Sequence, residues 1–219
     1  MMKRKYSINE HYFDEIDSCD KLRILGFLYA DGYNNVPRNA VYVEVSHSRR
    51  KMLEEIVKCL ESEHQLVDRV VAGKYRTVRL TVYSKLLSQR LNELGMTKAK
   101  SLTVKYPDWL SDTEAERAFI SGVWDGDGIM SSGMRSGTTG EYQWITYGFC
   151  GNHSLIDQIR SVMLRDCGVN LHRYQEGKII RAQSANTIDF PKFYSYIEPQ
   201  GDFFDPVKMN KAKAALEKG

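Results

Sequence analysis

Short segments in which apolar and polar residues alternate run through the chain and predict half-buried strands. Along residues 40–46, Val41, Val43 and Val45 alternate with polar side chains, which places the two kinds of side chain on opposite faces of a strand. Residues 75–83 show the same alternation and follow the short stretch 72–74 (Ala-Gly-Lys). Together with the β-rich residues 66–71, they predict a hairpin.

Apolar residues at helical spacing separate these strands. Along residues 50–61 they recur three and four positions apart, as in an amphipathic helix with one buried stripe. Further helices are expected over 20–28, which Gly32 would end, and over 84–94. The second half repeats this order, with strands expected at 142–150, 170–175 and 178–185, a helix at 154–166, and a flexible hairpin tip in the Gly- and Ser-rich stretch 131–140.

A nine-residue motif occurs twice. Residues 24–32 read ILGFLYADG and residues 120–128 read ISGVWDGDG, with Gly in third place and Asp-Gly at the end of both. Because the elements after each motif also repeat, the chain reads as two αββαββα units, 1–105 and 106–219, connected through 100–111. Such a repeat predicts an α+β fold with two pseudo-symmetric units.

Composition narrows the functional class only a little. The formal net charge of +3, with the basic excess in the first half, is compatible with nucleic-acid binding but too small to indicate it. The four cysteines form no CxxC pair, so neither a disulfide framework nor a zinc site is expected. No apolar run is long enough to span a membrane and no secretory segment is evident, so we expect an intracellular protein, in the cytoplasm, the nucleoid or an organelle.

The duplicated motif within αββαββα units resembles the LAGLIDADG family of homing endonucleases and maturases over nearly the whole chain. The resemblance implies that the two motif helices pack side by side at the centre, flanked by two four-stranded antiparallel sheets that form a saddle. Small residues would line the contact between the helices, and they stand four apart in each motif. These candidate interface residues are Gly26, Ala30, Gly122 and Gly126.

The last acidic residue of each motif carries the expected chemistry. If the two helices end together, Asp31 and Asp127 bring two like charges close, and these repel unless cations lie between them. The resemblance implies that both bind metal, aided by the backbone carbonyls of Ala30 and Gly126. Mg²⁺ suits phosphodiester hydrolysis with few protein carboxylates and several waters, and we expect Mn²⁺ to substitute for it.

Other catalytic candidates come from the resemblance as well. The family places a lysine near the scissile phosphates from the segment after the last helix of each unit. The candidates are Lys98, Lys100 and Lys105 in the first unit, with Lys100 favoured, and Lys208 or Lys211 in the second. His47 stands at the end of a strand where a polar residue often contacts metal-bound water. The sixth place of the first motif is Tyr29 and that of the second is Asp125, a position that varies in the family.

The free faces of the two sheets would lie along the major groove of DNA. Arginines are the best candidates for base contacts because they pair bidentately with guanine, although a register slip of one residue would exchange the two faces of a strand. The candidate DNA-binding residues are Arg69, Tyr75, Thr77, Arg79, Arg173, Arg181 and Gln183. Each half would cover about one helical turn, so the target would be an asymmetric site of about 20 base pairs bound by a monomer.

These features favour a site-specific, Mg²⁺-dependent endonuclease that cuts both strands of double-stranded DNA. Two alternatives use the same scaffold: a maturase that binds intron RNA and assists splicing, and a DNA-binding protein that does not cleave. Retention of both Asp31 and Asp127 favours the nuclease, since binding alone does not need paired carboxylates.

Overall fold

The computed structural model describes residues 6–97, 103–138 and 140–217. The first unit contains α1 (Cys19–Asp31), β1 (Gly32–Asn35), η1 (Val36–Arg38), β2 (Ala40–Ser46), η2 (His47–Arg49), α2 (Arg50–Cys59), β3 (Val67–Val71), β4 (Tyr75–Tyr83) and α3 (Lys85–Glu93). The second contains α5 (Thr113–Asp127), β5 (Gly128–Gly137), β6 (Gly140–Gly151), α6 (His153–Cys167), β7 (His172–Glu176), β8 (Ile179–Ser184), α7 (Phe190–Ile197) and α8 (Pro206–Leu216). The predicted order αββαββα is confirmed in both halves, and α8 follows the second.

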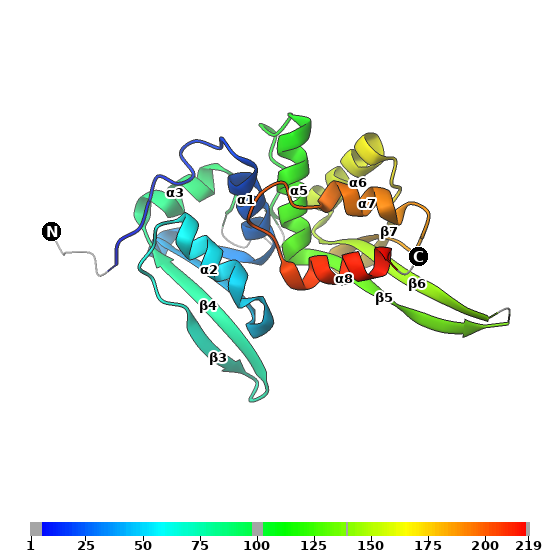
Figure 1. Ribbon diagram of the computed structural model, residues 1–219. Helices are drawn as coiled ribbons and strands as arrows, with labels where there is room; N and C mark the ends of the chain where they lie inside the picture. Colours follow the sequence, from blue (N-terminus) through cyan, green and yellow to red (C-terminus); the bar gives the residue numbers. More distant parts are fainter. Residues whose placement is uncertain (1–5, 98–102, 139, 218–219) are drawn as a thin grey trace.

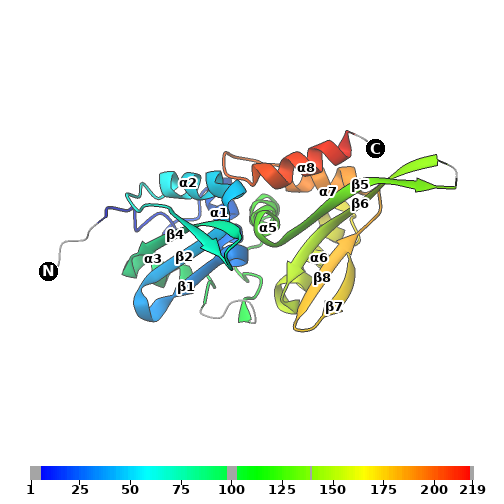
Figure 2. The ribbon, with the colours of Figure 1, turned by 90° about the horizontal axis from the view of Figure 1, so that it is seen from below.

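Each unit has a four-stranded antiparallel sheet, with strand orders β1-β2-β4-β3 and β5-β6-β8-β7. The alternation read from the sequence separates their faces. Val43 and Leu80 are buried on the helix-covered side of the first sheet, as Phe149 and Ala182 are in the second. The two sheets lie on opposite sides of the central helices and spread away from them, as Figures 1 and 2 show. The α+β fold with two pseudo-symmetric units is therefore confirmed.

The helices α1 and α5 pack against each other at the centre of the molecule (Figure 1). Their contact is part of a continuous apolar core in which Phe27 and Phe119 have no exposed surface. Segments beyond α7 return to the first unit: the Phe203 and Phe27 rings lie 5.6 Å apart, and the backbone N–H of Phe203 donates to Asp20 at 3.1 Å. The boundary between residues 105 and 106 stays a prediction.

Gly32 ends α1 as expected: it directly follows Asp31 as the C-cap, with φ −77°, outside the left-handed region. Glycine is needed there for space, since an added Cβ would lie 2.6 Å from the carbonyl oxygen of Leu28. The expectation of a flexible hairpin tip over 131–140 is wrong for residues 131–137, which belong to β5 and pair with β6. The four cysteines are free, and no helix in the described segments has the length and apolarity needed to cross a membrane.

Candidate active site and nucleic-acid interface

The two motif carboxylates stand at neighbouring helix ends. Asp31 is the last residue of α1 and Asp127 the last residue of α5. The four predicted interface residues lie where these helices touch. A Cβ added at Gly126 would come within 2.2 Å of the Ala30 Cβ, and one added at Gly122 within 1.9 Å of the Arg23 carbonyl oxygen. Only glycine permits this approach, which brings the carboxyl ends of both helices together.

Arg49 is the main site residue that the sequence did not reveal. It ends η2, and its Nη1 donates to Oδ2 of Asp31 at 3.0 Å. Its Nη2 donates to the carbonyl oxygen of Asp125, and its Nε lies 2.8 Å from Oδ2 of Asp205. One guanidinium therefore joins the first motif carboxylate to the end of the second motif helix and to the start of α8.

Lys208, in α8, lies at the carboxyl end of the second motif helix, α5. Its ammonium donates to the last carbonyl oxygens of α5, those of Trp124 at 2.7 Å, Asp125 at 2.9 Å and Gly126 at 3.0 Å. A cation at a helix C-terminus is stabilised by the partial negative charge of the unpaired carbonyls. Burial, together with the positive charge of Arg49, lowers the pKa of Lys208 to about 8.

A buried ion pair between Asp125 and Arg23 adjoins the cluster formed by Arg49, Lys208 and the motif carboxylates. Asp125, with no exposed surface, accepts from Arg23 Nε at 2.6 Å and Nη2 at 3.1 Å, and from the backbone N–H of Asp205 at 3.1 Å. Burial raises the pKa of Asp125, while the charge and hydrogen bonds of Arg23 oppose that rise. The sixth position of the second motif is thus a structural carboxylate. Its counterpart Tyr29 donates its hydroxyl to the carbonyl oxygen of Leu94.

The remaining catalytic candidates are less closely tied to the carboxylates. His47 was expected to contact metal-bound water, but its Nε2 lies 3.4 Å from Oδ1 of Asp68. Arg49, two residues further on, contacts Asp31 instead. Lys105 and Lys211 are exposed. The favoured Lys100, like Lys98, lies outside the described residues.

The donor set at the helix ends fits a hard divalent cation that keeps most of its water. Asp31 and Asp127 supply two carboxylates, and Mg²⁺ is commonly held by only one or two. Within 6–97, 103–138 and 140–217, no three His, Cys, Asp or Glu side chains gather into a metal-binding group, so a fully protein-caged ion does not fit. The carbonyl of Gly126 accepts from Lys208, so that predicted ligand already has a partner.

The free face of the first sheet carries the residues predicted for DNA contact. The register sets Arg69 opposite Thr77 and Glu44 opposite Arg79, all on the side away from the helices, and Tyr75 continues this row. Glu44 accepts from Arg69 Nη1 at 2.8 Å, Thr77 Oγ1 at 2.6 Å and Arg79 Nε at 2.7 Å. Although burial favours the neutral acid, these hydrogen bonds and both guanidinium charges hold the pKa of Glu44 below its ordinary value.

In the second sheet, the expected orientation of Arg173 is wrong by one residue. Arg181 and Gln183 alternate with buried Ile180 and Ala182 and lie on the free face. The register places Arg173 opposite Ala182, so it shares the helix-covered face, where its Nε donates to Asp157 of α6 at 3.1 Å. All five residues of β7 are exposed, so no burial alternation marks its faces. The residues of β7 on the free face are His172, Tyr174 and Glu176.

Comparison with known proteins identifies the fold. No protein-family model matches the sequence, and neither does any curated protein. Among solved structures, the LAGLIDADG meganuclease I-AabMI bound to uncleaved DNA matches with a TM-score of 0.61 and 11% identity, covering 90% of this chain and 89% of that one. I-SmaMI, bound to uncleavable DNA, matches with a TM-score of 0.62 and 10% identity, covering 90% and 88%. The chain has the fold of these meganucleases.

Proposed function

We propose that the protein is a site-specific endonuclease that hydrolyses both strands of double-stranded DNA with a divalent metal. The observation that carries the proposal is the pair of carboxylates, Asp31 and Asp127, at helix ends that Gly122 and Gly126 bring together. A fold shared with DNA-bound meganucleases, one of them an I-SmaMI complex with cleaved DNA, supports it.

The chain's own residues divide the task. Asp31 and Asp127 would hold Mg²⁺, which when bound lowers the pKa of a water molecule and neutralises charge on the reacting phosphate. Arg49, bonded to Oδ2 of Asp31, orients that carboxylate and adds positive charge beside the phosphate. Lys208 adds a second cation, and with a pKa of about 8 its Nζ can hold or release a proton near neutral pH.

The test is cleavage of a pool of long DNA duplexes in Mg²⁺, with sequencing of the cut ends. We expect the wild-type protein to cut at one reproducible site and to leave short 3′ overhangs. Asp31→Asn and Asp127→Asn should each abolish double-strand cleavage and leave DNA binding largely intact. Asp108→Asn, an exposed carboxylate of the connector, is the matched control and should cut like the wild type.

Thermal unfolding of each variant separates a catalytic defect from a folding defect, because Asp31→Asn also weakens the contact with Arg49. Full double-strand cleavage by either Asn variant would remove the substituted carboxylate from the mechanism, and with it the metal site that the two carboxylates share. Binding to a transcript without cutting any duplex would favour the RNA-binding maturase instead.

One observation favours a second candidate, a DNA-binding protein that does not cleave. Arg49 and Lys208 already bind the carboxylate of Asp31 and the carbonyl of Gly126, so two cationic side chains partly satisfy the oxygens that would hold metal. Retained specific binding with no cutting in either Mg²⁺ or Mn²⁺ would establish this alternative.

A further inference from the structure

Asp205 is a buried carboxylate in the segment that leads into α8. Only 1% of its surface is exposed, and its two side-chain oxygens have different partners. Oδ1 accepts from the backbone N–H groups of Val207 at 2.9 Å and Lys208 at 3.3 Å, and so caps α8. Oδ2 lies 2.8 Å from Nε of Arg49. The residue therefore contacts both the helix that carries Lys208 and the guanidinium of the first unit.

The cap of α8 alone does not require a charged residue. Asparagine and serine cap helices about as well as aspartate does, and a carboxylate that is buried without a cation is costly. Arg49, whose own side chain is mostly buried, supplies that cation. The charge of Asp205 is therefore matched to Arg49 rather than to the start of the helix.

Each nitrogen of the Arg49 guanidinium contacts a different aspartate. Nη1 donates to Oδ2 of Asp31 at 3.0 Å, and Nη2 donates to the backbone carbonyl oxygen of Asp125. Nε is the nitrogen beside Asp205. An arginine that pairs with a single carboxylate frequently binds both of its oxygens through two parallel N–H groups. Because Nε and Nη2 have other partners, Arg49 contacts Asp31 through one nitrogen and one oxygen.

Asp205 is fixed in turn by the second motif helix. Its backbone N–H donates to Oδ1 of Asp125 at 3.1 Å, and Asp125 pairs with Arg23 on the first motif helix. The carbonyl oxygen of Asp125 also accepts from Arg49 and from Lys208. Asp125, Asp205 and the two cations therefore form a closed set of contacts between the units.

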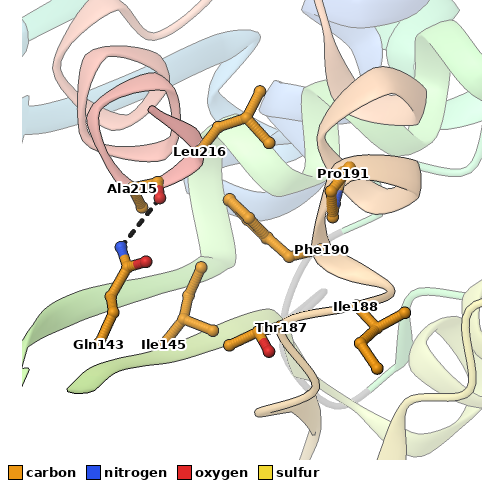
Figure 3. Close-up of a pocket in the computed structure, with 8 residues that line it drawn as sticks. All are labelled: Gln143, Ile145, Thr187, Ile188, Phe190, Pro191, Ala215 and Leu216. Carbon is orange, nitrogen blue, oxygen red and sulfur yellow. Dashed lines mark hydrogen bonds between the residues drawn. The ribbon is translucent and has the colours of Figure 1, made fainter. Parts of the chain in front are cut away.

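The far end of α8 is attached as well. Gln143 Nε2 of β6 donates to the carbonyl oxygen of Ala215 at 2.8 Å. Figure 3 shows this hydrogen bond, with Leu216 and Phe190 nearby. Because both ends of α8 have partners, we expect a change at Asp205 to act on the side chains around it rather than to displace the helix.

We propose that Asp205 is a positioning residue for the cleavage reaction: by pairing with Nε of Arg49, it prevents that guanidinium from binding both oxygens of Asp31, so that one oxygen stays free for the divalent metal. This inference rests on the proposed function. Without the charge of Asp205, Arg49 turns a second N–H group onto Asp31 and competes there with the metal. Asp205 acts through Arg49 and does not itself bind metal or DNA.

The experiment compares Asp205→Asn with Asp112→Asn on the target duplex that the wild-type protein cuts. Asparagine keeps an N-cap at either position and removes one charge. Asp112 is the matched control because it caps α5 in the same way, accepting from the backbone N–H groups of Glu114 and Ala115. It is exposed, and it lies at the opposite end of α5 from Asp127.

We expect Asp205→Asn to raise the Mg²⁺ concentration that gives half of the maximal single-turnover rate by about 10–100-fold, as loss of a partner around a metal ligand typically does. Affinity for Mn²⁺, measured by electron paramagnetic resonance on the protein bound to its cleaved duplex, should fall by a similar factor. DNA affinity in EDTA should stay unchanged, and Asp112→Asn should match the wild type throughout. Asp205→Ser, which also keeps the cap, replaces Asp205→Asn if thermal unfolding shows that the latter does not fold.

The effect should also depend on Arg49. In an Arg49→Gln background, Asp205→Asn should leave the Mg²⁺ requirement unchanged, because no guanidinium remains to turn onto Asp31. If Arg49→Gln does not fold, Arg49→Lys takes its place, since an ammonium group lacks the planar fork that binds two carboxylate oxygens in parallel.

The outcomes separate this role from the nuclease proposal. An unchanged Mg²⁺ requirement in folded Asp205→Asn, with normal cleavage by the wild type, would overturn the role of Asp205 and leave the nuclease proposal standing. A rise that is equally large with and without Arg49 would show that Asp205 does not act through that guanidinium, and would overturn the role as well. No cleavage of any duplex by the wild-type protein would overturn both proposals.

Discussion

The contact between α1 and α5 makes a prediction whose sign opposes ordinary helix propensity. Gly26 and Gly122 lie inside the two helices, and replacing an interior helical glycine by alanine normally stabilises a helix by about 1 kcal/mol. Here an added Cβ would lie 2.0 Å from the Phe119 carbonyl oxygen at Gly26, and 1.9 Å from that of Arg23 at Gly122. We therefore expect Gly26→Ala and Gly122→Ala to destabilise the protein.

The size of the stability loss follows from the distance by which α1 and α5 must move apart. Nonbonded atoms pack at about 3.5 Å, so the two helices must separate by roughly 1.5 Å to admit one methyl group. The obstructing atoms belong to the backbone and cannot rotate away. Overpacking of a rigid core costs about 1–3 kcal/mol and occasionally more. Because separation also loosens buried neighbours such as Phe27 and Phe119, we expect a net loss of about 2–4 kcal/mol, or about 5–15 °C in Tm for a chain of this size.

Urea unfolding followed by circular dichroism measures this loss. Ser161→Ala, at an exposed position of α6, is the control and should change the unfolding free energy by less than about 0.5 kcal/mol. In the double variant the second methyl group enters a gap that the first has already opened, so the two losses should add to less than their sum. Either single variant matching or exceeding the wild-type stability would show that the helices do not pack as closely as described.

Two further predictions concern the buried charges of the cluster. Arg23→Met leaves Asp125 buried without its cation and should lower the unfolding free energy, measured in urea, by about 3–5 kcal/mol. The double variant Arg23→Met, Asp125→Leu should recover most of this loss. If it does not, the loss does not come from an unpaired carboxylate. The pKa of Lys208 is about 8 in the folded state and 10.5 in the unfolded state. Between these pH values the unfolded state binds more protons, so the unfolding free energy should rise with pH from 8 to 10.5. Lys208→Met should lack this rise, and the same pH dependence in variant and wild type would contradict the prediction.

Local sequence patterns were sufficient to predict the fold because most helices and strands show their own spacing of apolar and polar residues. The alternation of Val41, Val43 and Val45 and the repeated Asp-Gly motif both survive in the structure. Where the alternation fails, the prediction fails too. Strand β7 is exposed along its whole length, so nothing in its sequence fixed the face of Arg173. The composition of β5, rich in Gly and Ser, is typical of a loop. Gly133 is needed there because the ring of Trp144, on the next strand, occupies the space of a side chain.

The site was less predictable because the repeat does not extend to it. Arg49 precedes α2, but the corresponding residue before α6 is Asn152, which caps that helix by accepting from the backbone N–H of Leu155. Lys208 comes from α8, which follows the second αββαββα unit. Searching for matching residues in the two halves therefore finds the carboxylates and misses Arg49, whereas Lys208 was among the candidates that the family resemblance implied. Arg49 joins Asp31 of one unit to Asp205 of the other, so neither repeat contains a complete site. The two units share a backbone pattern, but the group of charged side chains between them is asymmetric.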